Sequence, residues 1–139
     1  MIEFFVPGEP RAKQSFRVGV GRRGGYTPAR IKAWQADVGW AAQNALHGLE
    51  AWDVLYEFTK LAVILEFHLG NHRRIDGDNL SKPVLDGLNG IAWKDDRQIT
   101  EIHIYKNVTT DPQRVGVNVC YGTAIEISRR LNAKKKKPA

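Results

Sequence analysis

The sequence contains a single cysteine, Cys120, so the chain cannot form an internal disulfide bond. One cysteine and four scattered histidines also do not have the spacing of zinc ligands. No apolar run approaches the length of a membrane span, and the short apolar start, Met1 to Phe5, is interrupted by Glu3 and does not have the form of a signal peptide. These absences predict a protein of a reducing cytoplasm with no membrane association.

Acidic residues are absent from residues 129–139, which carry six lysines and arginines. The formal net charge of the whole chain is +6, so this segment accounts for all of it. Within the rest of the chain, residues 1–34 are strongly basic and residues 35–128 carry the compensating negative charge. A basic arm and a basic tail around an acidic centre favour binding of a polyanion next to a cation site.

The length of 139 residues favours one domain, which we place at 1–128, followed by a basic tail, 129–139, that we expect to be disordered. Periodicity predicts six elements: a strand over 2–6, a helix over 28–47, a strand over 55–69, a helix over 79–91, and strands over 99–105 and 115–121. The glycine- and arginine-rich segment 11–26 is either a hairpin or a mobile loop. We expect the last two strands to pair antiparallel in an α+β fold, a small mixed sheet with two packed helices.

Two aspartates and a lysine lie where the strand over 55–69 gives way to the helix over 79–91. Asp76 and Asp78 are two residues apart, so on an extended segment their carboxylates point the same way and can share a divalent cation. Lys82 follows Asp78 by one helical turn, on the same helix face. Its ammonium group can neutralise charge that develops on a phosphorus centre. The pattern indicates metal-dependent chemistry on a phosphodiester.

A second acidic pair, Asp95 and Asp96, lies in a turn before the strand over 99–105. If that strand lies beside the strand over 55–69, the turn can return over Asp76 and complete the metal site. Neighbouring residues on an extended chain face opposite ways, so we expect only one of the pair to be a direct ligand. The sequence leaves open which one it is.

Simpler interpretations of these residues exist. Asp-Gly-Asp-Asn is a common turn sequence, Asp78 could only cap a helix, and Lys82 could be a solvated surface charge. A calcium loop of the helix-loop-helix type is disfavoured, because residues 76–82 lack the alternating oxygen ligands and the closing glutamate. The concentration of these residue types at one strand end favours the metal site.

These residues resemble a known family. The pattern Asp76-x-Asp78-Asn79-x-x-Lys82-x-x-x-Asp86-x-Leu88, followed by Trp93-x-Asp95-Asp96-x-Gln98-Ile99, is similar to that of the RusA family of Holliday junction resolvases. The segments Pro7-Gly8-x-Pro10-x-x-Lys13-Gln14-Ser15-x-Arg17 and Tyr26-Thr27-Pro28 resemble its phage and Gram-positive-type members. The resemblance covers most of residues 2–121.

The resemblance implies a homodimeric endodeoxyribonuclease of recombination and repair, often carried by prophages and acting in the cytoplasm. Its cofactor would be Mg²⁺, for which Mn²⁺ can substitute, with no small-molecule cofactor. Carried over to this chain, the metal ligands are Asp76, Asp78 and Asp96, and Lys82 is the catalytic cation. Asp95 is the adjacent family aspartate and a second candidate ligand.

The substrate implied by the resemblance is a four-way DNA junction, which two symmetric nicks would resolve. We expect contacts to its phosphates from basic residues of the arm and of the acidic motif: Lys13, Arg17, Arg22, Arg23, Arg73 and Arg74. Two alternatives remain, a catalytically silent DNA-binding module and a broader nuclease of flaps and branched DNA. The complete set of motif aspartates and Lys82 favours the resolvase.

Overall fold

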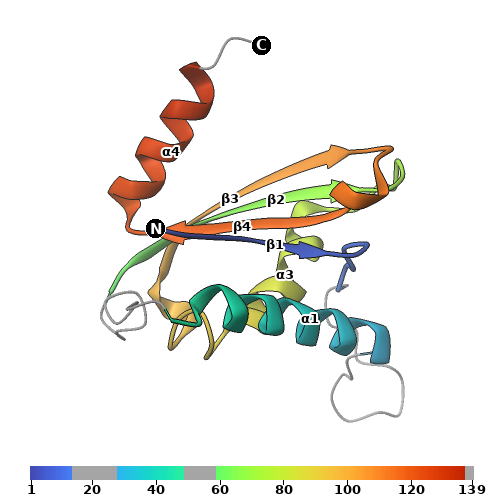
Figure 1. Ribbon diagram of the computed structural model, residues 1–139, viewed down its shortest axis with the longest axis horizontal. Helices are drawn as coiled ribbons and strands as arrows, with labels where there is room; N and C mark the ends of the chain where they lie inside the picture. Colours follow the sequence, from blue (N-terminus) through green and yellow to red (C-terminus); the bar gives the residue numbers. More distant parts are fainter. Residues whose placement is uncertain (14–27, 49–58, 137–139) are drawn as a thin grey trace.

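The structure is a computed structural model that describes residues 1–13, 28–48 and 59–136 (Figure 1). The predicted hairpin region and the first residues of the strand predicted over 55–69 lie outside the described residues. Within these ranges three helices and four strands follow in chain order, with two short 3₁₀ turns: β1 (Ile2–Pro7), α1 (Ala29–Leu46), β2 (Leu61–Leu69), α3 (Gly77–Leu88), η1 (Asp96–Gln98), β3 (Ile99–Val108), η2 (Pro112–Arg114), β4 (Gly116–Gly122) and α4 (Ala124–Lys136). No helix in the described ranges combines the length and apolar character needed to cross a bilayer.

The four strands form one mixed sheet in the order β1-β4-β2-β3, which confirms the predicted α+β class. Strand β3 is parallel to β2, whereas β4 is antiparallel to both β2 and β1. The predicted pairing of the last two strands is therefore wrong, because β2 lies between them. Strand β2 is almost entirely buried and is hydrogen-bonded along both of its edges. The connection through α3 is long enough for the crossover that a parallel pair requires.

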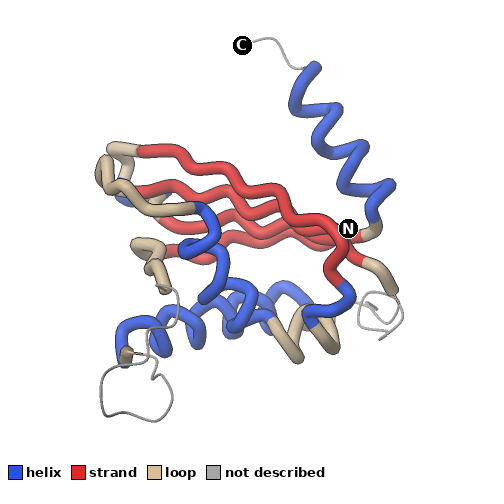
Figure 2. The backbone as a smooth tube through the Cα atoms, turned by 180° about the vertical axis from the view of Figure 1, so that it is seen from behind, coloured by secondary structure: helices blue, strands red, loops and turns tan. Residues whose placement is uncertain are grey.

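The main core lies between one face of the sheet and the two helices α1 and α3, which Figure 2 shows together on one side of the strands. Strand β2 contributes the alternate residues that the sequence predicted for one face: Leu61, Val63, Leu65, Phe67 and Leu69. Helix α3 adds Leu80, Val84 and Leu88, at helical spacing, and these three side chains are fully buried. The apolar face of α3 therefore fixes which of its residues point outward.

Two glycines, Gly39 and Gly87, lie where helices α1 and α3 contact each other. A Cβ atom added to Gly87 of α3 would lie 2.6 Å from the carbonyl oxygen of Gln35 on α1. One added to Gly39 would lie 3.1 Å from the carbonyl oxygen of Gly87. Contacts to backbone atoms at such distances cannot be relieved by a side-chain rotation, so the absence of side chains here sets the distance between the helices.

Helix α4 covers part of the opposite face of the sheet and is a third helix that the sequence analysis did not predict (Figures 1 and 2). It extends to Lys136, which differs from the expected disordered tail over 129–139; residues 137–139 lie outside the described part. Ile127 is buried against Ala62, Ile64 and Cys120, with Leu131 packed beside them. This small second cluster accounts for the docking of α4.

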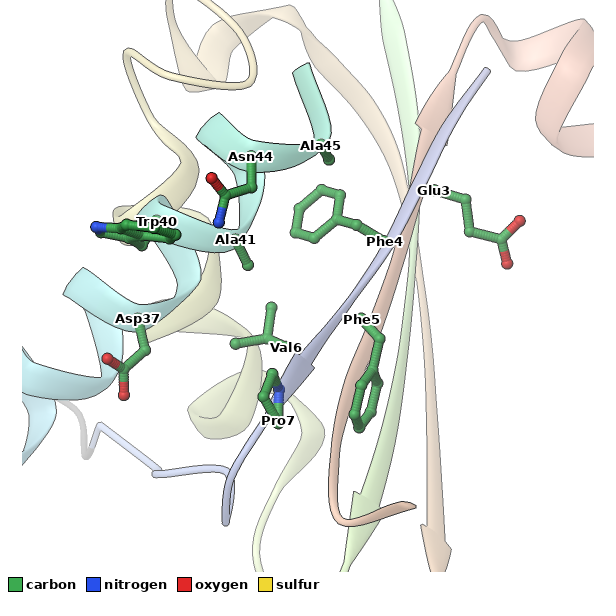
Figure 3. Close-up of a pocket in the computed structure, with 10 residues that line it drawn as sticks. All are labelled: Glu3, Phe4, Phe5, Val6, Pro7, Asp37, Trp40, Ala41, Asn44 and Ala45. Atoms are coloured by element: carbon green, nitrogen blue, oxygen red, sulfur yellow. The ribbon is translucent and has the colours of Figure 1, made fainter. Parts of the chain in front are cut away.

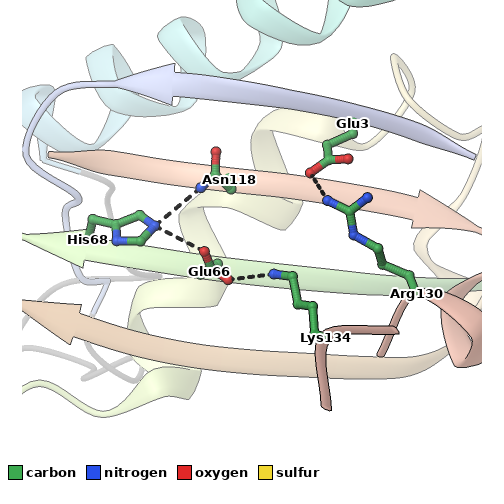
Figure 4. A network of polar contacts seen from close by, with 6 residues as sticks. All are labelled: Glu3, Glu66, His68, Asn118, Arg130 and Lys134. Carbon is green, nitrogen blue, oxygen red and sulfur yellow. Dashed lines mark hydrogen bonds and ion pairs between the residues drawn. The ribbon is translucent and has the colours of Figure 1, made fainter. Parts of the chain in front are cut away.

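Two ion pairs drawn in Figure 4 add to the docking of α4, beside the pair of Glu126 with the N-terminal amine of Met1. Arg130 donates to Glu3 at 2.7 Å, and Lys134 donates to Glu66 at 2.8 Å. Glu66 also lies 3.2 Å from Nε2 of His68. Burial alone would raise the pKa of Glu66, but the hydrogen bond and charge of Lys134, together with His68, outweigh it and lower the pKa below 4.5.

This lowered pKa predicts a loss of stability in acid. A carboxyl group whose pKa is lower in the folded state stabilises that state above its unfolded pKa, and the contribution disappears as the pH falls through the folded pKa. Since the pair is partly exposed, we expect the contribution to be at most about 1 kcal/mol. Urea unfolding of the parent and of Glu66→Gln should differ at pH 7 and converge as the pH falls through the folded-state pKa of Glu66. Asp37→Asn, a change to an exposed carboxylate, is the control, and a pH-independent difference for Glu66→Gln would contradict the assignment.

Candidate metal and DNA-binding site

The three predicted catalytic residues of the first motif lie on consecutive turns of one helix end. Asp76 occupies the N-cap position of α3 in an extended conformation, and Asp78 lies in the first turn. Lys82 follows one turn later, and all three side chains are exposed. Within the described residues none of the three takes part in a hydrogen bond or ion pair of its side chain, and Asp76 does not cap the helix. Two carboxylates and an ammonium group are thus available to a ligand at the N-terminal end of α3.

This helix end rests on the middle of β3. A Cβ atom added to Gly77 would lie 3.1 Å from Cγ2 of Ile104, and Nζ of Lys106 donates to the carbonyl oxygen of Ile75 at 2.8 Å. The segment between β2 and α3 therefore turns back along β3 before the helix begins. The peptide groups at the start of α3 carry unpaired N–H groups and the positive end of the helix dipole, which favour an anion next to Asp76 and Asp78.

Asp95 is engaged by the turn that contains it. Its Oδ1 accepts from the backbone N–H of Arg97 at 2.9 Å, and its Oδ2 accepts from the Arg97 guanidinium at 3.0 and 3.2 Å. These hydrogen bonds hold the pKa of Asp95 below its ordinary value, and the bond from the Arg97 side chain has the larger effect. Gln98 closes the turn by accepting from the backbone N–H of Asp95. Both oxygens of Asp95 therefore have partners that shape the turn.

Asp96 has one oxygen held and one without a partner in the described part of the chain. Its Oδ1 accepts from Nε1 of Trp93 at 2.7 Å. The Trp93 ring is fully buried and packs edge-to-face on Tyr121, with ring centroids 5.3 Å apart. A carboxylate oriented through one oxygen by a rigid donor, with the other oxygen available, is the usual arrangement of a metal ligand. The contacts favour Asp96 over Asp95 as a ligand.

The two acidic segments do not form one cluster within a single chain. The Asp95–Asp96 turn precedes Ile99 directly, whereas Gly77 lies at Ile104, and these positions on β3 are about 16 Å apart. Among the described residues no group of three or more acidic, histidine or cysteine side chains could hold a metal ion. The reason is that β2 and β3 are parallel. The Asp95–Asp96 turn therefore lies near the start of β2, at Leu61, whereas the segment after Leu69 starts from the other end of β2 and returns only part of the length of the strand.

The predicted DNA-contacting residues divide into three groups. Lys13 is docked on α3, since its backbone N–H donates to Asn79 at 2.8 Å and its ammonium group lies 3.3 Å from Asp86. The basic arm thus leaves the described structure next to the Asp78 motif. The arm residues Arg17, Arg22 and Arg23 lie outside the described residues.

The last group, Arg73 and Arg74, has different surroundings. Arg73 donates to Glu9 at 2.7 Å and to the carbonyl oxygen of Pro10 at 2.9 Å, which ties the acidic motif to the segment after β1. Arg74 is exposed and has no side-chain partner among the residues described. Arg73 is therefore fixed by the protein, and Arg74 is available to a ligand.

A separate hollow of about 800 Å³ lies between β1 and α1 (Figure 3). Figure 3 shows Phe4 and Val6 directed toward the helix, where Ala41 points back toward the strand. Asp37 also borders the hollow, and no lysine or arginine is among the described residues that line it. An apolar groove with an acidic border does not suit a phosphate backbone, and none of the predicted site residues faces it.

One comparison, with models of known protein families, found a match. The family model of "Endodeoxyribonuclease RusA" matches residues 7–120, which is most of the chain and includes both acidic segments. A search of curated proteins found no match.

Proposed function

Because the chain belongs to the RusA endodeoxyribonuclease family, we propose that it is a magnesium-dependent enzyme that resolves four-way DNA junctions in recombination and repair. The observation that carries the proposal is the start of α3, where the carboxylates of Asp76 and Asp78 have no hydrogen-bond or ion-pair partner in the described residues and Lys82 follows one turn later. Clustered charges of this kind repel one another unless a counter-ion is bound.

The donor set at α3 fits Mg²⁺. This ion is commonly bound by one or two carboxylates together with substrate phosphates and water, so Asp76 and Asp78 are sufficient to begin a site. When bound, the ion would lower the pKa of a coordinated water and offset phosphate charge. Asp96 would be the third ligand, and a second copy of the chain could supply ligands that one chain holds apart. This supports the predicted homodimer, which two symmetric nicks also require.

The chain itself contributes charge and orientation. Lys82 lies on the same side of α3 as Asp78, where its ammonium group stabilises the negative charge of the pentacovalent phosphorus and of the leaving oxygen. The N-terminal peptide groups of α3 favour a phosphate oxygen at the same place. Lys13, whose backbone N–H donates to the carbonyl oxygen of Asn79, adds a cation beside α3. Together these groups would position the scissile strand without reading its bases.

One observation favours a second candidate, a catalytically silent DNA-binding module. The acidic segments of a single chain stay apart, and a chain that never assembles them would bind junctions without cutting. A prophage origin, a cytoplasmic location and use of Mn²⁺ remain predictions.

Cleavage of a synthetic four-way junction tests the function. We expect magnesium-dependent nicks at symmetric positions in opposite strands, with much slower cutting of a Y-fork and of linear duplex. Equal rates on the fork would favour the broader nuclease. Binding of the junction without incision, with either Mg²⁺ or Mn²⁺, would favour the silent module.

A further inference from the structure

A second hollow, of about 350 Å³, opens where β2 and β3 end, on the side to which the acidic motif returns. Its polar lining consists of His72, Arg73, Arg74, Lys106 and the neutral Asn107, and no acidic residue lines it among those that the structure describes. Leu69 and Val108 form its apolar floor. The hollow thus collects three permanent cations and a histidine from two separate segments of the chain.

Two of these cations are held in place by the protein. Arg73 is fixed by Glu9 and by the carbonyl oxygen of Pro10. Lys106 donates one of its three N–H bonds to the carbonyl oxygen of Ile75, which leaves two for a ligand. Donors that are already ordered lose less conformational entropy when they bind than free surface lysines do. The hollow therefore has the properties of a formed anion site.

Charge identifies the kind of ligand. The carboxylate of Glu9 offsets Arg73, but Arg74 and Lys106 have no acidic partner within the described residues. Like charges that share a concave surface repel each other, and a bound anion relieves this repulsion. A tetrahedral phosphate group accepts hydrogen bonds from several directions, which matches donors that converge from two segments.

We propose that this hollow binds a phosphate group, and that in the working enzyme it is a backbone phosphate of the DNA strand that flanks the scissile bond. The proposal rests on the proposed function. Ile75, whose carbonyl holds Lys106, directly precedes Asp76. Since successive phosphates of one duplex strand advance by about 3.4 Å along the helix axis, a strand held here reaches Asp76 within a few nucleotides. Lys106 is then a positioning residue that the motif alone does not identify.

Binding measured without cleavage tests the proposal. Lys106→Gln and Arg74→Gln should each weaken junction binding in Ca²⁺ several-fold and lower the slope of log K against log salt by about 1. Lys106→Arg should retain the slope of the parent. Lys60→Gln changes an exposed lysine at the opposite end of β2 and is the matched control. Unchanged slopes in both glutamine variants, with melting temperatures equal to that of the parent, would overturn the proposal.

A second arm distinguishes the source of the phosphate. Inorganic phosphate should shift the amide resonances of residues 72–74 and 106 in the parent, and junction DNA should displace it. Phosphate binding that DNA does not displace would reject the backbone assignment in favour of a free phosphate ligand. A parent that binds junctions with the expected slopes but never cuts them would reject the nuclease and leave the phosphate site in place.

Discussion

Replacing Asp78 with asparagine should lower the rate of junction cleavage by a factor on the order of 10² to 10⁴, because a metal ligand contributes several kcal/mol to the barrier. The same change should leave junction binding close to that of the parent, since it removes no cation. Folding should be little affected, because the side chain is exposed and makes no hydrogen bond or ion pair in the described part of the chain. Single-turnover cleavage and a binding titration in Ca²⁺ measure the two effects separately.

Three variants place limits on this interpretation. Asp37→Asn, on the exposed face of α1, should cleave at the rate of the parent. Asp96→Asn should lose activity as Asp78→Asn does, whereas Asp95→Asn should alter mainly the turn that Arg97 and Gln98 close. Full activity of Asp78→Asn, or equal losses in Asp37→Asn, would remove α3 from the active site.

Replacing Trp93 with alanine should cost about 3 to 5 kcal/mol of unfolding free energy. The ring is fully buried against Tyr121, and its removal leaves a cavity that the surrounding strands cannot fill. Typical domains have only about 5 to 15 kcal/mol in total, so the variant should unfold at a much lower urea concentration. Trp40→Ala, at a tryptophan that is 65% exposed, should change stability far less.

Trp93→Phe separates packing from orientation. Phenylalanine keeps an aromatic ring beside Tyr121 but cannot donate the hydrogen bond that holds Oδ1 of Asp96. We expect Trp93→Phe to lose less unfolding free energy than the alanine variant does. Its cleavage rate should nevertheless fall by more than this small loss of stability explains. A variant with reduced stability and unaltered cleavage at low temperature would show that Trp93 does not orient Asp96.

The strands and the two core helices could be predicted from the sequence because their signals are local. The alternation of Leu61 to Leu69 identifies a strand and its buried face, and Leu80, Val84 and Leu88 identify the buried side of α3. The same local rule placed Lys82 one turn after Asp78, as the structure has it. Asp76 and Asp78 were predicted together because they are neighbours in the sequence.

The order of the strands could not be predicted, because it depends on which strands pair with a neighbour on both edges and so lie inside the sheet. That order decides where Asp95 and Asp96 lie relative to Asp76. The docking of α4 was missed for a related reason: the partners of Arg130 and Lys134 are Glu3 and Glu66, which come from distant strands. Lys106 carried no signal either, since only the return of the acidic motif along β3 brings it to Ile75.

The close approach of α1 and α3 at Gly39 and Gly87 bears on how activity in related chains should be judged. A methyl group at position 87 would meet the backbone of α1 and force α3 to shift or tilt. The carboxylates at the other end of the helix would then be displaced with it, although every acidic residue was still present in the sequence. A homologue can therefore preserve the whole catalytic signature and be inert, and the residue at this crossing is as informative about its competence as the aspartates are.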